Sequence, residues 1–96
     1  MELLVTYDVD TTTRTGEQRL RRVAKACESI GQRVQKSVFE VVCTPGQRLA
    51  LEAQLLDIID PTRDSVRIYH LRTGTLRDTQ HLGAATDANH DGPLIR

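Results

Sequence analysis

The 96 residues carry 13 Lys and Arg against 13 Asp and Glu, giving a formal net charge of zero, and 39% are hydrophobic. This composition is typical of one soluble globular domain. No signal peptide is evident, and no apolar run approaches the roughly 18 residues of a membrane span, so we expect a cytoplasmic protein. Cys27 and Cys43 show no CxxC spacing, and we expect two small, buried, reduced thiols rather than a disulfide or a catalytic thiol.

The first element is predicted as a strand over Glu2–Asp8, with Leu3, Val5 and Tyr7 on one face. It ends directly in two carboxylates, Asp8 and Asp10. An acid at the end of an apolar strand is costly unless water, a metal or a cation reaches it. Metal binding by Asp8 is one interpretation, and capping of the turn or pairing with an arginine is the other. For Asp10, loop capping is preferred.

The next segment predicts a helix over residues 16–30, with Gly31 as the stop because glycine tolerates a left-handed conformation. Positive charge concentrates here, since residues 14–36 contain seven bases against Glu17 and Glu28. The bases are Arg14, Arg19, Arg21, Arg22, Lys25, Arg33 and Lys36. This skew favours phosphate binding, and a solvated helix face is the alternative.

Residues 32–43 predict two short strands that break at residues 35–37, because the parity of the apolar positions changes there. A second helix is expected to follow. Thr44 as its N-cap, Pro45 at its first position and Gln47 two residues further on fit a capping box.

The second helix is expected to end at Asp60-Pro61. Its predicted apolar stripe is Leu49, Ala53, Leu56 and Ile59, widened by Leu51, Leu55 and Ile58. Residues 65–71 form the last predicted strand. The order strand–helix–strand–strand–helix–strand over residues 1–71 predicts an α+β, ferredoxin-like sandwich, with four antiparallel strands and two helices on one face. The other sheet face stays open for a ligand or a second subunit.

Residues 72–96 are predicted to form a C-terminal extension. The stretch 72–91 is polar with little periodicity, whereas residues 92–96 are apolar again. This ending predicts a short edge strand that pairs within the chain or with a partner subunit. The three histidines show no ligand spacing with the cysteines, so no zinc site is expected.

Three segments are distinctive in combination: residues 4–9, residues 19–25 and residues 31–40, the last with the run Arg33-Val34-Gln35-x-Ser37-Val38-Phe39-Glu40. Together with Tyr7-Asp8, they resemble the CRISPR-associated protein 2 family. The resemblance covers residues 3–71 well and the tail weakly. It implies a homodimer of ferredoxin-like subunits that acts in the acquisition stage of CRISPR immunity, alongside a separate CRISPR integrase.

The resemblance also implies a site. Asp8 matches the metal-binding aspartate of the family, whose members are described as Mg²⁺-dependent endonucleases on RNA or double-stranded DNA. Asp8, Ser37 and Phe39 are therefore the expected catalytic residues. The expected nucleic-acid-binding residues are Arg14, Arg19, Arg21, Arg22, Lys25 and Arg33. Because Mg²⁺ keeps most of its waters, two Asp8 carboxylates across a dimer axis would be a reasonable site.

Alternatives remain open at this point. Ser37 is also consistent with a residue that only ends the turn, and Phe39 with core or interface packing, which is preferred because stacking aromatics are scarce. At the level of function, a nuclease competes with a non-catalytic dimeric adaptor that bridges DNA for the integrase. A small-molecule regulatory module is the third candidate.

Overall fold

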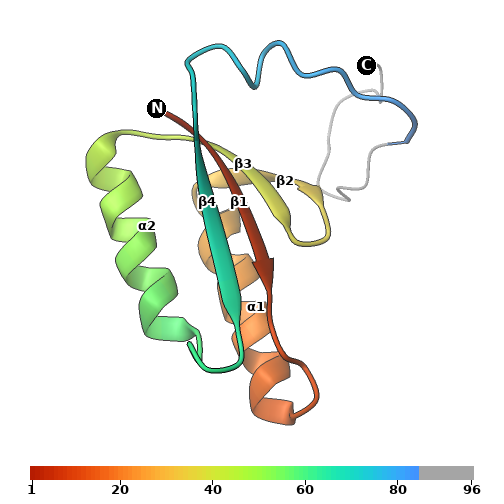
Figure 1. Cartoon of the computed structure of the whole chain (residues 1–96), viewed down its shortest axis with the longest axis vertical. Coiled ribbons are helices and arrows are strands. Elements are labelled where there is room, and N and C mark those ends of the chain that lie inside the picture. The colour runs from red at the N-terminus through yellow and green to blue at the C-terminus, as the bar shows by residue number, and fades with distance from the viewer. Residues whose placement is uncertain (85–96) are drawn as a thin grey trace.

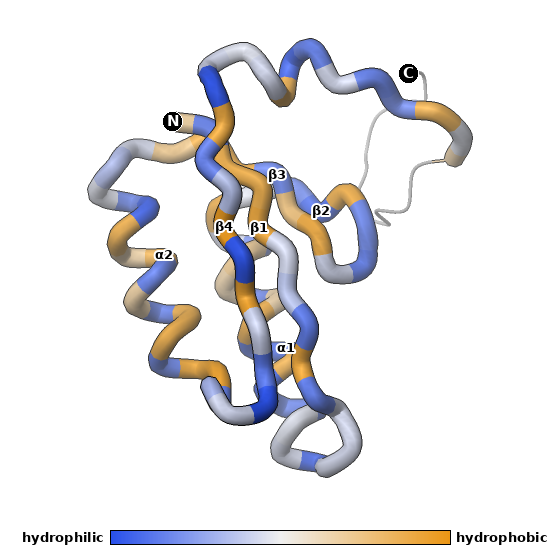
Figure 2. Tube along the Cα trace, viewed as in Figure 1, coloured by the Kyte–Doolittle hydropathy of each residue, from blue (hydrophilic) through white to orange (hydrophobic). Residues whose placement is uncertain are grey.

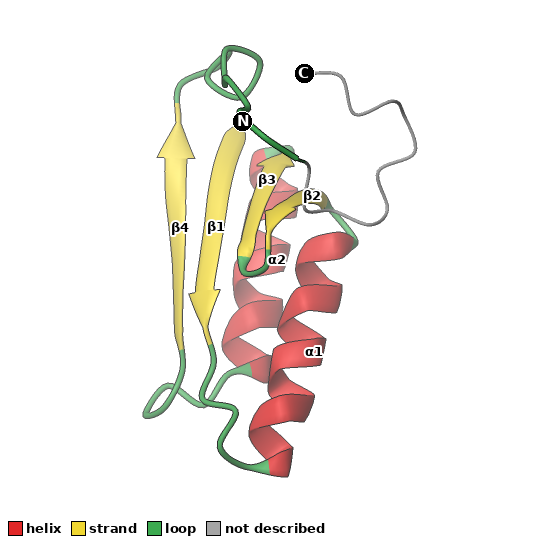
Figure 3. Ribbon diagram, turned by 90° about the vertical axis from the view of Figure 1, so that its right-hand side faces the viewer, coloured by secondary structure: helices red, strands yellow, loops and turns green. Residues whose placement is uncertain are grey.

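The protein, seen in a computed structural model that describes residues 1–84, consists of two layers (Figures 1 and 3). One layer is an antiparallel sheet with strand order β2-β3-β1-β4, and the other is a pair of helices on one face of that sheet. The elements are β1 (Glu2–Asp8), α1 (Arg14–Glu28), β2 (Gly31–Gln35), β3 (Val38–Val42), α2 (Pro45–Ile58) and β4 (Ser65–Leu71). The predicted α+β, ferredoxin-like sandwich is confirmed.

The core lies between the sheet and the helices, and β1 runs through its centre. Leu3 and Val5 are fully buried and Tyr7 is nearly so, as the alternation in this strand predicts. The helices contribute Val23 and Cys27 from α1 and Leu55 from α2, among others. Burying a side chain of this size stabilises a fold by roughly 1.5–3 kcal/mol, so the helix-facing side of β1 anchors the domain.

Helix α1 begins earlier than predicted because Thr13 is its N-cap, with its side chain accepting a hydrogen bond from the Gly16 amide at 3.0 Å. The helix ends at Glu28, and the prediction that Gly31 is its left-handed stop is wrong. Gly31 is the first residue of β2, and no left-handed conformation is recorded there. A Cβ at this position would lie 2.6 Å from the Val41 side chain and 2.8 Å from the Glu40 carbonyl oxygen, so close packing against β3 requires glycine.

The capping box of α2 is confirmed. The Thr44 hydroxyl accepts a hydrogen bond from the Gln47 amide at 3.1 Å, and the Gln47 side chain accepts one from the Thr44 amide at 2.9 Å. Two backbone donors that a helix start leaves without partners are thereby satisfied.

We predict that Thr44→Ala lowers the free energy of unfolding by about 1 kcal/mol, the usual cost of losing an N-cap side chain. Urea denaturation at fixed protein concentration measures this loss. Gln54→Ala is the matched control, because Gln54 is an exposed position on the same helix. An equal loss in both variants would mean that the box contributes nothing specific.

The predicted apolar stripe of α2 is wrong in its centre. Leu49 and Leu56 are 55% and 65% exposed, and Ala53 between them is exposed as well. The side that docks on the core consists of Leu51, Leu55 and Ile58. Apolar residues occur around most of this helix (Figure 2), so its sequence does not identify which side faces the sheet.

Residues 72–84 contain no helix or strand. They follow β4 across the N-terminal end of β1, where the Glu2 carboxylate accepts hydrogen bonds from the amides of Gly74 at 2.6 Å and Leu76 at 2.9 Å. These hydrogen bonds lower the pKa of Glu2. The predicted edge strand over residues 92–96 lies outside the described residues.

Both cysteines are free and buried, as predicted, and burial raises the pKa of Cys27 to about 11. A thiol with so high a pKa is protonated at neutral pH and is a poor nucleophile. Neither α1 nor α2 is long and apolar enough to cross a bilayer.

Candidate functional site

Asp8 lies at the end of β1, on the sheet face that the helices leave open. Its neighbour Tyr7 points into the core, so the period of two in a strand turns Asp8 to the opposite side, where it is exposed. Ser65, the first residue of β4, is its cross-strand partner. Within residues 1–84 the Asp8 carboxylate makes no hydrogen bond or ion pair, so it is available to a ligand.

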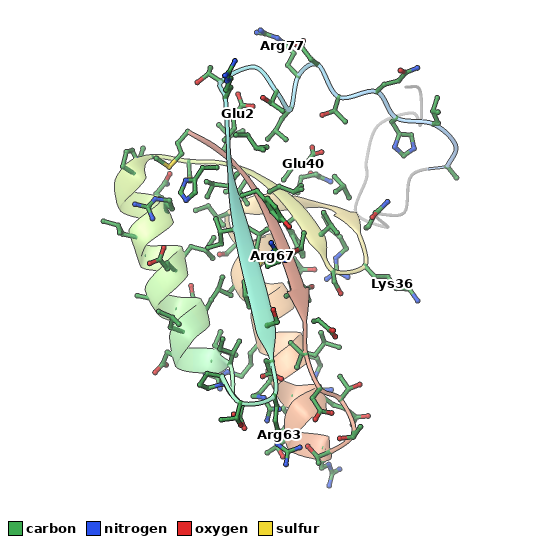
Figure 4. The ribbon with its side chains drawn as sticks, viewed as in Figure 1. Glu2, Lys36, Glu40, Arg63, Arg67 and Arg77 are labelled. Atoms are coloured by element: carbon green, nitrogen blue, oxygen red, sulfur yellow. The ribbon has the colours of Figure 1, made fainter. Side chains whose placement is uncertain are left out.

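The turn between β2 and β3 brings Ser37 to the same end of the sheet. The Tyr7 amide donates a hydrogen bond to the Ser37 carbonyl oxygen at 3.1 Å, and the Tyr7 hydroxyl donates one to the Lys36 carbonyl oxygen at 3.3 Å. Ser37 is half-buried and the Lys36 side chain extends into solvent (Figure 4). Two predicted site residues, Asp8 and Ser37, therefore come from different strand ends to one place.

Arg67 on β4 is a nearby cation that is not among the predicted site residues. It is the cross-strand partner of Thr6, which the alternation of β1 places on the same open face as Asp8. Figure 4 shows Arg67 on β4. Its guanidinium is 5.4 Å from the ring centroid of Tyr69, and it forms no ion pair within the described chain. The alternation in residues 65–71 indicates that Arg67 lies on the opposite face from Val66 and Ile68. Only the pairing of β4 with β1 places this arginine near Asp8.

Phe39 lies on the other side of the sheet from Asp8. It is fully buried, its ring centroid is 6.2 Å from that of Tyr7, and the Arg33 guanidinium covers its ring at 5.1 Å. A side chain in this position packs the core and is not accessible to a ligand on the open face. We therefore assign Phe39 to the core and leave it out of the site.

Two of the predicted nucleic-acid-binding arginines are engaged in ion pairs. Arg19 donates to the buried carboxylate of Asp64 at 2.7 Å, and Arg33 donates to Glu28 at 3.2 Å. Because each charge is paired with a carboxylate of the same chain, these two arginines contribute less positive electrostatic potential for binding a phosphate.

The other four predicted bases lie on the exposed side of α1, and we call them the α1 basic stripe: Arg14, Arg21, Arg22 and Lys25. Three of the four buried residues of this helix, Gly16, Val23 and Cys27, occupy the opposite side. Because α1 covers the helix-bearing face of the sheet (Figure 3), the α1 basic stripe points away from the open face that carries Asp8. The predicted bases and the predicted metal ligand are therefore on different sides of one chain.

Asp10 has a structural role in the loop after β1. One of its carboxylate oxygens accepts hydrogen bonds from the amide and the hydroxyl of Thr12, at 3.0 and 2.7 Å, and the other pairs with Arg63 at 3.2 Å. The Thr12 hydroxyl, the Thr12 amide and Arg63 together lower the pKa of Asp10. This is the loop-capping role preferred for Asp10 from the sequence.

The donor set at Asp8 fits a loosely held hard cation. Within residues 1–84 no three His, Cys, Asp or Glu side chains are grouped to hold a metal ion. Mg²⁺ retains most of its waters in proteins and is often held by one or two carboxylates. One chain offers the single free carboxylate of Asp8, so a second chain is needed for a two-carboxylate site.

The fold and the geometry at Asp8 define a small ferredoxin-like protein with a free carboxylate at the end of its first strand. The sequence profile of the family described as CRISPR associated protein Cas2 matches residues 1–79. The chain belongs to this family.

Among curated relatives, the CRISPR-associated endoribonuclease Cas2 3 of Rhodospirillum rubrum is 52% identical over 97% of this chain and 98% of its own. The CRISPR-associated endonuclease Cas2 of Halalkalibacterium halodurans is 44% identical over 99% of both chains. The crystal structure of Streptococcus pyogenes Cas2 superposes with a TM-score of 0.77 at 48% identity, covering 86% of this chain and 100% of that one.

Proposed function

We propose that this protein is a Mg²⁺-dependent endonuclease of CRISPR adaptation that acts as a homodimer on RNA or double-stranded DNA. The main observation in support is the exposed carboxylate of Asp8 on the open sheet face, which has no partner within residues 1–84. The names of the relatives support the activity, since one is called an endoribonuclease and the other an endonuclease.

A homodimer formed through the open sheet face gives this site its second carboxylate. That face carries apolar surface, since Val42 is 68% exposed and Tyr69 is 41% exposed. Burying such surface against an identical face is favourable and symmetric. In this arrangement the two Asp8 side chains approach each other across the two-fold axis.

The chemistry of phosphodiester cleavage matches these residues. The two Asp8 carboxylates would hold Mg²⁺, which would supply positive charge against the phosphate and a bound water. Arg67, on the same face, is suited to hold a phosphate oxygen because a guanidinium binds phosphate with two parallel hydrogen bonds. Ser37 lies at the rim, where its hydroxyl can bind a water or a phosphate oxygen.

The proposal is tested by metal removal. Purified protein is incubated with labelled single-stranded RNA and, in a second arm, with double-stranded DNA, each in the presence of Mg²⁺ or of EDTA. We expect cleavage of at least one substrate with Mg²⁺ and none with EDTA, together with a dimer in sedimentation velocity. Cleavage that persists in EDTA, or a strictly monomeric protein, would contradict the proposal.

A second candidate function follows from the position of the α1 basic stripe. Four cations face away from Asp8, and a dimer presents two such stripes on its outside. This arrangement suits a DNA-bridging adaptor for the CRISPR integrase, in which phosphate contacts rather than hydrolysis are the function. The two functions are compatible, because they use different faces.

We predict that the double variant Arg21→Glu/Arg22→Glu weakens duplex DNA binding and reduces the slope of log affinity against log salt by about 2, because two phosphate contacts are lost. Fluorescence anisotropy over a salt series measures both quantities. Arg72→Glu/Arg77→Glu makes the same charge change in the segment after β4 and should keep the slope. Equal losses in both variants would mean that only net charge matters.

A further inference from the structure

Asp64 is the only charged residue of the described chain that is buried, and its side chain is completely inaccessible to solvent. Its carboxylate accepts hydrogen bonds from three directions. Arg19 of α1 donates from Nε at 2.7 Å and from Nη2 at 3.4 Å. The backbone amides of Asp10 and Asp60 donate at 3.0 and 2.9 Å. One carboxylate thus joins α1, the loop after β1 and the loop before β4.

A buried carboxylate is expensive unless hydrogen bonds and an opposite charge compensate it. Here burial alone raises the pKa of Asp64, but the hydrogen bonds from Arg19 and from the two backbone amides outweigh it and hold the pKa below its usual value. The group is ionised at neutral pH and fully satisfied. Removing the charge leaves the two backbone amides with a poorer acceptor and the Arg19 guanidinium without its ion-pair partner.

The two loops that Asp64 joins contain the same hydrogen-bonded Asp–x–Thr turn. Asp10 accepts hydrogen bonds from the amide and the hydroxyl of Thr12, and Asp60 accepts the same pair from Thr62, at 3.0 and 2.6 Å. Arg63 donates a further hydrogen bond to the other carboxylate oxygen of Asp10 at 3.2 Å. Asp64 therefore binds the amide at the head of each turn and sets the position of one loop against the other.

This hydrogen-bond network holds the backbone on both sides of Asp8, in its own strand and in the paired strand. Asp10, whose amide Asp64 binds, is two residues after Asp8. Ser65, which follows Asp64 directly, is the cross-strand partner of Asp8. Both backbone segments that meet at Asp8 are therefore held by the same buried carboxylate.

We propose that Asp64, together with Arg19, is the positioning residue of the Asp8 site. It does not touch metal or nucleic acid, but it fixes the backbone that carries the Asp8 carboxylate. This inference rests on the proposed function of Asp8. It also gives a role to Arg19, which lies on α1 but is paired inside the fold and is not part of the α1 basic stripe. The Asp8 carboxylate must approach the Asp8 of a second subunit closely, so the backbone that carries it has to be rigid. Small displacements of a metal ligand lower metal affinity.

The test compares Asp64→Asn with Val41→Ala, a core variant at the opposite end of the sheet, both at a temperature where circular dichroism shows them folded. The first readout needs no metal. We expect the Asp10 amide to exchange hydrogen at least about 10-fold faster in Asp64→Asn than in Val41→Ala. Should Asp64→Asn not fold, Arg19→Lys replaces it, because lysine keeps the charge but lacks the Nε–H donor.

The second readout is the Mg²⁺ concentration that gives half-maximal cleavage. Disturbing a group that orients a metal ligand typically costs 10–100-fold in affinity or activity, so we expect a rise of about 10-fold in Asp64→Asn and none in Val41→Ala. An unchanged Mg²⁺ requirement, or equal changes in both variants, would overturn the inference and leave a purely structural ion pair. If Asp8→Asn itself still cleaves, the proposed function fails, whereas faster exchange at Asp10 still supports the positioning of this backbone.

Discussion

Replacing Asp8 with asparagine is expected to reduce Mg²⁺-dependent cleavage by about 100-fold or more, while the protein stays folded and keeps the oligomeric state of the unaltered protein. Loss of a group that only supports a metal ligand costs 10–100-fold, so loss of the ligand itself should reach the upper end of that range. The fold should tolerate the change, because the Asp8 side chain is exposed and its strand pairing with Ser65 is made by the backbone. Single-turnover cleavage with excess protein measures the effect without interference from product release.

Asp57→Asn is the matched control, since it removes one exposed carboxylate from α2 and leaves the open sheet face intact. It should cleave at the rate of the unaltered protein. If Asp8→Asn also cleaves at that rate, the activity of the preparation does not come from this site. If neither the unaltered protein nor the control cleaves any substrate, whereas duplex binding falls steeply with salt, the adaptor function remains as the explanation for the α1 basic stripe.

The largest expected effect on stability comes from Phe39→Ala. The ring is fully buried between Tyr7 and the Arg33 guanidinium, so its removal leaves a cavity in the centre of the core. We expect the free energy of unfolding to fall by about 4 kcal/mol. Such a loss is a large part of the roughly 5–15 kcal/mol that a small domain has. Urea denaturation followed by circular dichroism measures it, at one protein concentration because any self-association adds stability by mass action.

Phe39→Leu separates packing from stacking on a base. Leucine fills much of the same volume, so it should recover most of the lost stability, although it has no aromatic face. If Phe39 instead stacks on a nucleobase, both variants should lose nucleic-acid affinity while the urea midpoint stays unchanged. That result would contradict the assignment of Phe39 to the core.

Local sequence signals predicted the elements of this fold well. The capping box at Thr44 and Gln47 involves residues three apart, and the alternation in β1 involves residues two apart. A short stretch of sequence is therefore enough to recognise each pattern. The side of α2 that docks on the sheet is predicted wrongly at its centre: Leu49 and Leu56 are exposed, whereas Leu51 and Leu55, expected only to widen the stripe, face the core. Apolar residues surround most of that helix, and its orientation depends on the shape of a sheet that forms from distant segments.

The candidate site divides in the same way. Asp8 could be selected from the sequence because a carboxylate ending an apolar strand is unusual locally and because the segment resembles a known family. Arg67 could not, because its nearness to Asp8 depends on the register between β1 and β4, strands that are more than 50 residues apart. A charge count places Arg19 with the exposed bases, because it does not reveal that Asp64, 45 residues away, pairs with it inside the protein.

The sequence by itself determined the order of the elements, the sandwich they form and the identity of the acid at the end of β1, because each is encoded by residues close together in the chain. Only the tertiary structure decided which charges are free and which are paired, and which side of α2 faces the core. Those outcomes depend on long-range pairing: the register of the sheet sends alternate residues to opposite faces, and a buried carboxylate can engage an arginine only where the fold brings them together.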